Sequence, residues 1–289
     1  MRKPWKEAGL ALLNLVAVVL VIVVAQPVLR KFLPDAVGAA TLALLILATY
    51  IAASKWIERR ATSELEINQL LPEIAGGFVG GFALFAGVIG ILWAAGVYHP
   101  AGRGTVTGLA SGFTLALTAG IVEEILFRGL LFRLSSKLLG TWGALLFTAT
   151  LFGAAHAFNP GATISSSLAI ALEAGVLLGA AYAATQRLWL PIGLHIGWNF
   201  TEGSVFSMSI SGMTKSAGLF QGSLSGPRLL TGGQFGPEAS IVAVIVCFAA
   251  ALYFIRRTAA MHRAEPPVWS KARLQGTAED MAAKSQSST

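Results

Sequence analysis

Apolar residues fill most of this chain in long runs that short polar or glycine-rich breaks separate. Eight runs can be traced, at about residues 8–29, 36–57, 74–98, 106–132, 141–158, 164–186, 191–200 and 240–255. A helix needs about 20 mostly apolar residues to cross the hydrocarbon of a bilayer. The pattern predicts an all-α, polytopic membrane protein with about eight transmembrane helices, although the run at 191–200 is short for a full span.

The segments between these runs define the organisation of the chain. Two N-terminal helices (1–59) precede a core segment (60–202), in which residues 63–71 mix acidic and apolar side chains as an amphipathic interfacial segment does. A Gly- and Ser-rich outer loop (203–237), a last helix (238–258) and a tail expected to be disordered (259–289) follow. A loop of that length is either a functional lid or disordered.

The first apolar run follows three basic residues and superficially resembles a secretory signal peptide. It is longer than the ~7–15-residue core of such a peptide and ends at Arg30 and Lys31 without an obvious cleavage site. We therefore expect it to be a retained transmembrane helix.

Composition agrees with this architecture and excludes several classes of protein. Of 289 residues, 55% are hydrophobic and 12% charged, and the mean hydropathy is +0.68, too apolar for a soluble domain. The net charge of +7 does not indicate nucleic-acid binding, because membrane proteins accumulate Lys and Arg in their cytoplasmic loops. Membrane lipid is the expected surrounding partner. The single Cys247 precludes an internal disulfide and is expected in the core.

The basic residues also predict an orientation. With eight helices and a cytoplasmic N-terminus, fifteen of the 21 Lys and Arg residues fall on the cytoplasmic side and five outside, with Arg128 set aside as a site candidate. The positive-inside rule then places both termini in the cytoplasm. A bacterial inner membrane is the expected location.

Three charged residues interrupt the fourth apolar run. An ionisable side chain at the bilayer centre costs at least ~2.5–3.5 kcal/mol on insertion scales and is usually paired, cavity-facing and functional. Glu124 and Arg128 have the i,i+4 spacing of an ion pair, so the arginine is expected to neutralise Glu124 and brace the helix. Glu123 projects about 100° away, and it is the candidate general base.

Two histidines and an asparagine are expected to meet Glu123 in an intramembrane polar cavity. The fourth and fifth runs form a hairpin around Gly140, and Glu123 and His156 lie 17 and 16 residues from it, hence at nearly equal depth. His195 and Asn199 share one face of the seventh segment. One carboxylate could take a proton from water that an imidazole positions, while an imidazole and an amide donate to the oxyanion of a peptide carbonyl.

Structural roles are alternatives for each of these residues. A single intramembrane histidine more often links two helices than catalyses, and Phe152 is expected to pack rather than to contact substrate. Glu173, in the sixth run, is a further carboxylate without an evident partner. A substrate channel, a water-filled cavity and a hydrogen bond to His156 or His195 are all open for it.

Taken together, the motifs resemble those of the CAAX prenyl protease and bacteriocin-processing family of intramembrane endopeptidases. That family has two glutamates with an arginine four residues after the second, then Phe-x-x-x-His, then His-x-x-x-Asn. Here these motifs stand as Glu123-Glu124-x-x-x-Arg128, Phe152-x-x-x-His156 and His195-x-x-x-Asn199. The resemblance covers about residues 60–202 and implies hydrolysis of a peptide bond of a membrane-associated protein or peptide.

The resemblance also implies roles for the residues. Glu123 and His156 would activate the water, and His195 and Asn199 would stabilise the oxyanion. Members of the family have also been regarded as metalloproteases, because Glu123, His156 and His195 could hold zinc with water in the fourth position. We expect the metal-free glutamate mechanism, with no cofactor. Nothing in the chain indicates a prenylated substrate.

Two other classes of function fit parts of the pattern. A proton-coupled transporter could use Glu123, His156 and Glu173 as a relay, although the chain shows no internal repeat of the kind that many carriers have. A non-catalytic membrane scaffold or immunity factor could keep the fold alone. That alternative predicts that substitutions of Glu123 and His156 leave the cellular phenotype intact.

Overall fold

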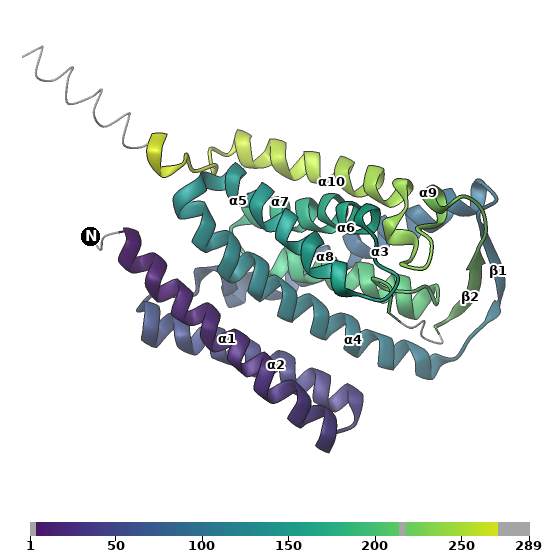
Figure 1. Ribbon diagram of the computed structural model, residues 1–289, viewed down its shortest axis with the longest axis horizontal. Coiled ribbons are helices and arrows are strands. Elements are labelled where there is room, and N and C mark those ends of the chain that lie inside the picture. The colour runs from purple at the N-terminus through teal and green to yellow at the C-terminus, as the bar shows by residue number, and fades with distance from the viewer. Residues whose placement is uncertain (1–3, 214–217, 271–289) are drawn as a thin grey trace, which may run out of the picture.

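The computed structural model describes residues 4–213 and 218–270, and this part of the chain is mostly helical (Figure 1). Its α-helices are α1 (Pro4–Phe32), α2 (Asp35–Ala53), α3 (Leu70–Ala94), α4 (Val106–Glu124), α5 (Arg133–Ala155), α6 (Ile164–Ile170), α7 (Val176–Thr185), α8 (Trp189–Asn199), α9 (Arg228–Thr231) and α10 (Ile241–Ala260). Stretches of π-helix extend or join several of these: η1 (Ser54–Glu58), η4 (Ile125–Phe132), η6 (Ala171–Gly175) and η7 (Phe200–Val205). Short 3-10 turns are η2 (Ser63–Leu65), η3 (Ile67–Gln69), η5 (His156–Phe158) and η8 (Pro237–Ala239).

The helices form a membrane protein. Five segments of the described chain are long and apolar enough to cross a bilayer: Lys6–Phe32, Asp35–Glu58, Ser63–Ala94, Ile164–Thr185 and Ile241–Ala260. Large apolar side chains on the outside, such as Leu44 and Leu146, are 65% and 71% exposed, and soluble proteins rarely present broad surfaces of this kind. The prediction of a polytopic, helical membrane protein is therefore confirmed, and the count of eight crossings stays a prediction.

The charged segments that the positive-inside rule assigns to the cytoplasm lie together at one end of the bundle. Lys137 near the start of α5 pairs with Glu7 in α1 at 2.9 Å, and Arg133 pairs with Glu58 in η1 at 2.7 Å. The first residues of α1 and the C-terminal part of the chain lie at this end, while the two strands lie at the opposite end (Figure 1). The described part of the chain thus begins and ends on the same side of the bundle.

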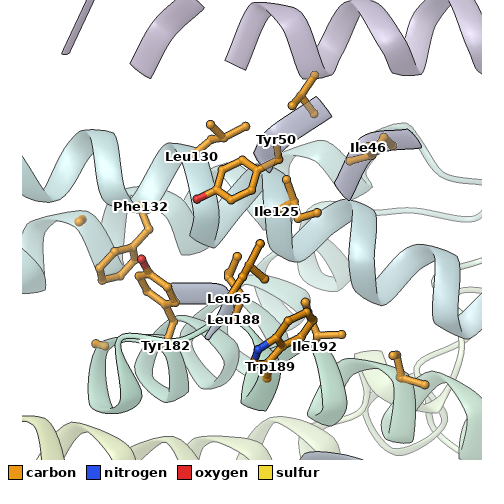
Figure 2. Close-up of a cluster of buried hydrophobic side chains, with 14 of the residues drawn as sticks. Ile46, Tyr50, Leu65, Ile125, Leu130, Phe132, Tyr182, Leu188, Trp189 and Ile192 are labelled. Carbon is orange, nitrogen blue, oxygen red and sulfur yellow. The ribbon is translucent and has the colours of Figure 1, made fainter. Parts of the chain in front are cut away.

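A buried cluster attaches the N-terminal helix pair to the rest of the molecule. Tyr50 of α2 is fully buried, and its ring lies beside Leu130 and Ile125 of η4 (Figure 2). Its hydroxyl group bonds to the Glu64 carboxylate, which also pairs with Arg60. The cluster continues through the side chains of Leu65, Phe132, Tyr182, Leu188, Trp189 and Ile192.

The segment expected to be a long outer loop contains regular structure. The eighth helix continues through η7 to Val205, and residues 220–224 form strand β2 (Phe220–Leu224), which pairs antiparallel with β1 (Tyr98–Arg103). The all-α expectation omitted this small sheet. The strands have no apolar–polar alternation to reveal them, since β1 is exposed at every position after its first. Residues 214–217 of the loop lie outside the described chain.

The predicted disordered tail begins with an ordered part. Helix α10 runs to Ala260, and Arg263 then donates a hydrogen bond to the Ala184 carbonyl. Glu265 bonds to Thr141 through its backbone N–H and carbonyl, at 2.9 and 3.0 Å. Gly140 makes this docking feasible, because its φ of 70° interrupts α5 and a Cβ there would lie 2.6 Å from the Glu265 carbonyl oxygen. Residues 271–289 of the tail lie outside the described chain.

Helices α3 and α8 pack closely through glycines on both helices. A Cβ added at Gly77 would lie 2.5 Å from the Leu190 carbonyl oxygen, and one at Gly193 would lie 2.6 Å from the Ile74 carbonyl oxygen. Such contacts let two backbones touch, as small residues do between membrane helices. Because α8 carries His195 and Asn199, this packing positions both of them.

We expect Gly77→Ala to lower stability and Gly76→Ala to leave it unchanged. The Gly77 methyl would collide with the α8 backbone at a cost of ~1–3 kcal/mol, whereas a methyl at Gly76 meets no other atom within 4 Å. Thermal unfolding of the two purified variants in detergent measures the difference. Equal melting temperatures would contradict the assigned packing.

Candidate active site

The Glu-Glu-x-x-x-Arg segment forms the buried base of the site. Glu124 is 0% exposed and Arg128 1% exposed, and Arg128 Nη1 lies 2.7 Å from Glu124 Oε1. Arg128 Nη2 donates to the carbonyl oxygens of Ala174 and Gly175 at 3.2 and 3.1 Å. The i,i+4 pair expected from the sequence is present, and it also ties η4 to η6.

Glu124 has a second partner that the sequence argument did not find. His195 Nδ1 lies 2.9 Å from the same Glu124 Oε1 that accepts from Arg128. Since a carboxylate only accepts hydrogen bonds, Nδ1 carries the proton in this contact. Glu124 therefore joins α4 to α8 and sets the orientation of the His195 ring.

Glu123 faces the two histidines of the other motifs. Glu123 Oε2 lies 3.9 Å from His156 Nε2 and 4.0 Å from His195 Nε2. This oxygen is buried and forms no hydrogen bond to the described residues. Both distances exceed a direct hydrogen bond and suit a bridging water. The structure thus brings together the three side chains that the motif spacing placed at one depth.

His156 is held by its own helix end. Helix α5 ends at Ala155, and His156 Nδ1 lies 2.8 Å from the Phe152 carbonyl oxygen. Because a carbonyl oxygen only accepts, Nδ1 donates in this contact. In the neutral ring Nε2 is then an acceptor, and it faces Glu123. The Phe152 ring is fully buried, 4.7 Å from the His156 ring and 4.8 Å from the Arg128 guanidinium carbon. Phe152 thereby fixes the imidazole by packing.

Asn199 and Glu173 line one cavity with the two histidines. Asn199 is 7% exposed and lies one turn beyond His195 on α8. Glu173 is 2% exposed and adjoins the thiol of Cys247, itself buried in α10. Three alternatives were left open for Glu173, and its position on this cavity favours the one in which it lines a water-filled cavity.

Two carboxyl groups and an indole of the cavity region were missed. Glu238 and Trp198 line the cavity, and Glu202 of η7 adjoins Glu238. Burial raises the pKa of the Glu238 carboxyl group. Glu202 could have been noticed in the sequence, because it lies three residues after Asn199, just beyond the apolar run at 191–200. Glu238, in η8 just before the last helix, lies far from every motif in sequence.

Stretches of π-helix coincide with the polar positions. Arg128 lies in η4, Glu173 in η6 and Glu202 in η7. A π-helical turn adds a residue to a helix and re-aims the side chains that follow, which is why such turns are frequent at functional sites. These wide turns direct polar side chains of three apolar helices toward the bundle interior.

The spacing of the three zinc-ligand candidates does not match a tetrahedral zinc site. Ligand atoms ~2.0 Å from zinc lie ~3.3 Å from one another, whereas Glu123 Oε2 lies 3.9 and 4.0 Å from the two histidine nitrogens. No group of three His, Cys, Asp or Glu side chains within the described residues has metal-binding geometry. We therefore assign no step of the chemistry to a metal.

Comparison with known proteins agrees with the motifs. Residues 105–201 match the family described as type II CAAX prenyl endopeptidase, Rce1-like. No curated protein and no solved structure matches the chain. The matched segment contains all three motifs, so the resemblance to the CAAX-type membrane endopeptidases is confirmed for the part of the chain that builds this site.

Proposed function

We propose that this protein is an intramembrane endopeptidase that hydrolyses a peptide bond of a membrane-associated protein or peptide. The observation that carries the proposal is the convergence of Glu123 Oε2 on the Nε2 atoms of His156 and His195, at 3.9 and 4.0 Å. A carboxylate oxygen without a hydrogen bond to the described residues, facing two imidazoles across the width of one water molecule, is an arrangement suited to activating that water.

In this mechanism Glu123 is the general base and His156 positions the water. The neutral His156 ring donates from Nδ1 to the Phe152 carbonyl, so its Nε2 accepts one hydrogen bond from the water. Glu123 takes the other proton as the water oxygen attacks the peptide carbonyl. The protonated Glu123 then gives that proton to the leaving amine as the carbon–nitrogen bond breaks, which regenerates the carboxylate.

His195 and Asn199 stabilise the oxyanion. Because His195 Nδ1–H donates to Glu124, the ring offers a donor at Nε2 only as the imidazolium, so this role uses the protonated ring. The side-chain amide of Asn199, on the same wall of the cavity, supplies a second donor. Losing one oxyanion donor typically costs ~10²–10³-fold in kcat.

The helices around the cavity support two further parts of the proposal, the class of substrate and the orientation in the membrane. The cavity lies among apolar helices, so the scissile bond must belong to a chain that enters or lies against the membrane. We propose a bacterial inner-membrane location with both termini cytoplasmic. The ion pairs Lys137–Glu7 and Arg133–Glu58 support the orientation, because they hold segments expected on the cytoplasmic side together at one end of the bundle. Nothing in the cavity indicates that the substrate is prenylated.

Reconstitution distinguishes an endopeptidase from a proton-coupled transporter. Liposomes containing the purified protein and an internal pH dye are mixed with a library of lipid-anchored, fluorescence-quenched peptides. We expect fluorescence release with discrete cleavage products and no proton flux. Proton flux without peptide cleavage would support the transporter, and neither signal would favour a non-catalytic scaffold.

We expect peptide cleavage to survive the removal of divalent metals. The mechanism uses the Glu123 carboxylate rather than a metal to polarise water, so dialysis against EDTA and treatment with 1,10-phenanthroline should change the rate less than about twofold. Elemental analysis of the active preparation accompanies the assay. Loss of activity on chelation, restored by zinc alone, would contradict the metal-free mechanism.

A further inference from the structure

The cavity lined by His156, His195 and Asn199 is large enough for a small water cluster. Its polar lining residues are His156, His195, Asn199, Glu173, Trp198, Ser211 and Glu238, and about 30 Å³ is open to the centres of water-sized molecules. About 10–15 Å³ on this measure admits one water molecule. The cavity therefore has room for about two waters in contact with the catalytic side chains.

Two polar atoms of the cavity wall have no partner among the described residues. Trp198 is 7% exposed, its Nε1 is buried, and no group of those residues accepts its proton. Glu238 is 2% exposed, and its Oε1 receives no hydrogen bond from them. Buried polar groups are nearly always satisfied by protein or by ordered water. The indole N–H needs an acceptor and the carboxylate oxygen needs a donor, and water can serve as either.

The neighbouring indole of Trp189 shows that this chain can satisfy such a group with protein. Trp189 is 8% exposed, and its Nε1 donates to the Glu66 carbonyl at 3.0 Å. The Trp198 ring is fixed differently, by an edge-to-face contact with Phe85 at 4.9 Å between ring centres. Trp198 lines the cavity, and its N–H, unlike that of Trp189, has no acceptor among the described residues.

Water is the ligand that fits this pair of atoms. A water molecule can accept from Trp198 or donate to Glu238, and the cavity has room for about two such molecules. An anion is disfavoured by Glu173 and Glu238, and no group of three ligands with metal geometry occurs in the described chain. His156, whose Nε2 faces Glu123, lines the same space.

We propose that Trp198 and Glu238 hold water in this cavity, and that this water replaces the molecule consumed at Glu123. The second half of the proposal rests on the proposed function. Peptide hydrolysis uses one water for each bond broken, and bulk water is scarce among apolar helices. In this account Trp198 and Glu238 are positioning residues, since they act through water and touch neither substrate nor the attacking carboxylate.

Water-edited solid-state NMR of the protein in bilayers tests the first half. The chain has seven Trp residues, so the indole signal of Trp198 is identified by its loss in Trp198→Phe. We expect rapid magnetisation transfer from water to the Trp198 indole proton and slow transfer to that of Trp189. Glu238→Leu should slow the transfer to Trp198 and leave the Trp189 signal unchanged, which also reports an intact fold. Equally slow transfer to both indoles in the unmodified protein would overturn the proposal.

Kinetics of the same variants test the second half. Glu238→Leu should lower kcat by ~10-fold or more with unchanged KM, because water delivery and not substrate binding is impaired. Glu238→Gln, whose amide can still bind water, should recover most of the loss. Unchanged kcat in Glu238→Leu would overturn the supply role. If the unmodified protein cleaves no peptide, the proposed function fails while the NMR result still decides whether water is held.

Discussion

Replacing Glu123 by Gln is expected to lower kcat for peptide cleavage by ~10²–10⁴-fold. The amide has nearly the same size and shape as the carboxylate, so the fold should persist. It cannot accept a proton from water, however, and the proton for the leaving amine is lost with it. Initial rates of the purified variant in liposomes, with the melting temperature measured in parallel, give the result.

A matched substitution separates this effect from a general loss of charge. Glu66 is an exposed glutamate whose backbone carbonyl, rather than its side chain, bonds to Trp189. Glu66→Gln makes the same chemical change outside the cavity and should keep the activity of the unmodified protein. A Glu123→Gln variant that is equally active would remove Glu123 from the mechanism.

The second large effect is expected for Arg128→Met, which should lower the free energy of unfolding by ~3–5 kcal/mol. The guanidinium is fully buried and is the cationic partner of a fully buried carboxylate, so its loss leaves Glu124 uncompensated. It also removes the hydrogen bonds to the backbone carbonyl oxygens of Ala174 and Gly175. Thermal unfolding in detergent should show a markedly lower melting temperature.

The double variant Glu124→Gln/Arg128→Met tests the cause of that loss. Removing both charges eliminates the uncompensated carboxylate, so the double variant should be more stable than Arg128→Met alone. It should still be inactive, because His195 Nδ1 loses its carboxylate partner. A single Arg128→Met variant as stable as the unmodified protein would show that the pair does not brace the site.

Local spacing and hairpin depth were sufficient to predict part of the site. The Glu124–Arg128 pair depends only on the i,i+4 geometry of one helix, and the approach of Glu123 to His156 depends on their nearly equal distances from Gly140. Both arguments use positions within one helix or across one short turn. They required no knowledge of how distant helices pack.

The contacts that the sequence did not reveal join segments far apart in the chain. Glu124 and His195 are 71 residues apart, and their hydrogen bond exists only because α8 packs beside α4. Glu238 reaches the cavity from η8, the short turn before the last helix, at the end of a segment expected to be an outer loop. The pairing of β1 with β2 was hidden for the same reason, since neither strand carries a local pattern.

The most direct test of the account is the source of the oxygen in the product. Purified protein in liposomes is mixed, in H₂¹⁸O, with a lipid-anchored peptide that the liposome assay has shown to be cleaved. The fragments formed in a single turnover are analysed by mass spectrometry. The account predicts one ¹⁸O atom in the new carboxyl group of the N-terminal fragment, formed by the unmodified protein and not by Glu123→Gln. Absence of cleavage, or the same labelled product at the same rate from Glu123→Gln, would contradict it.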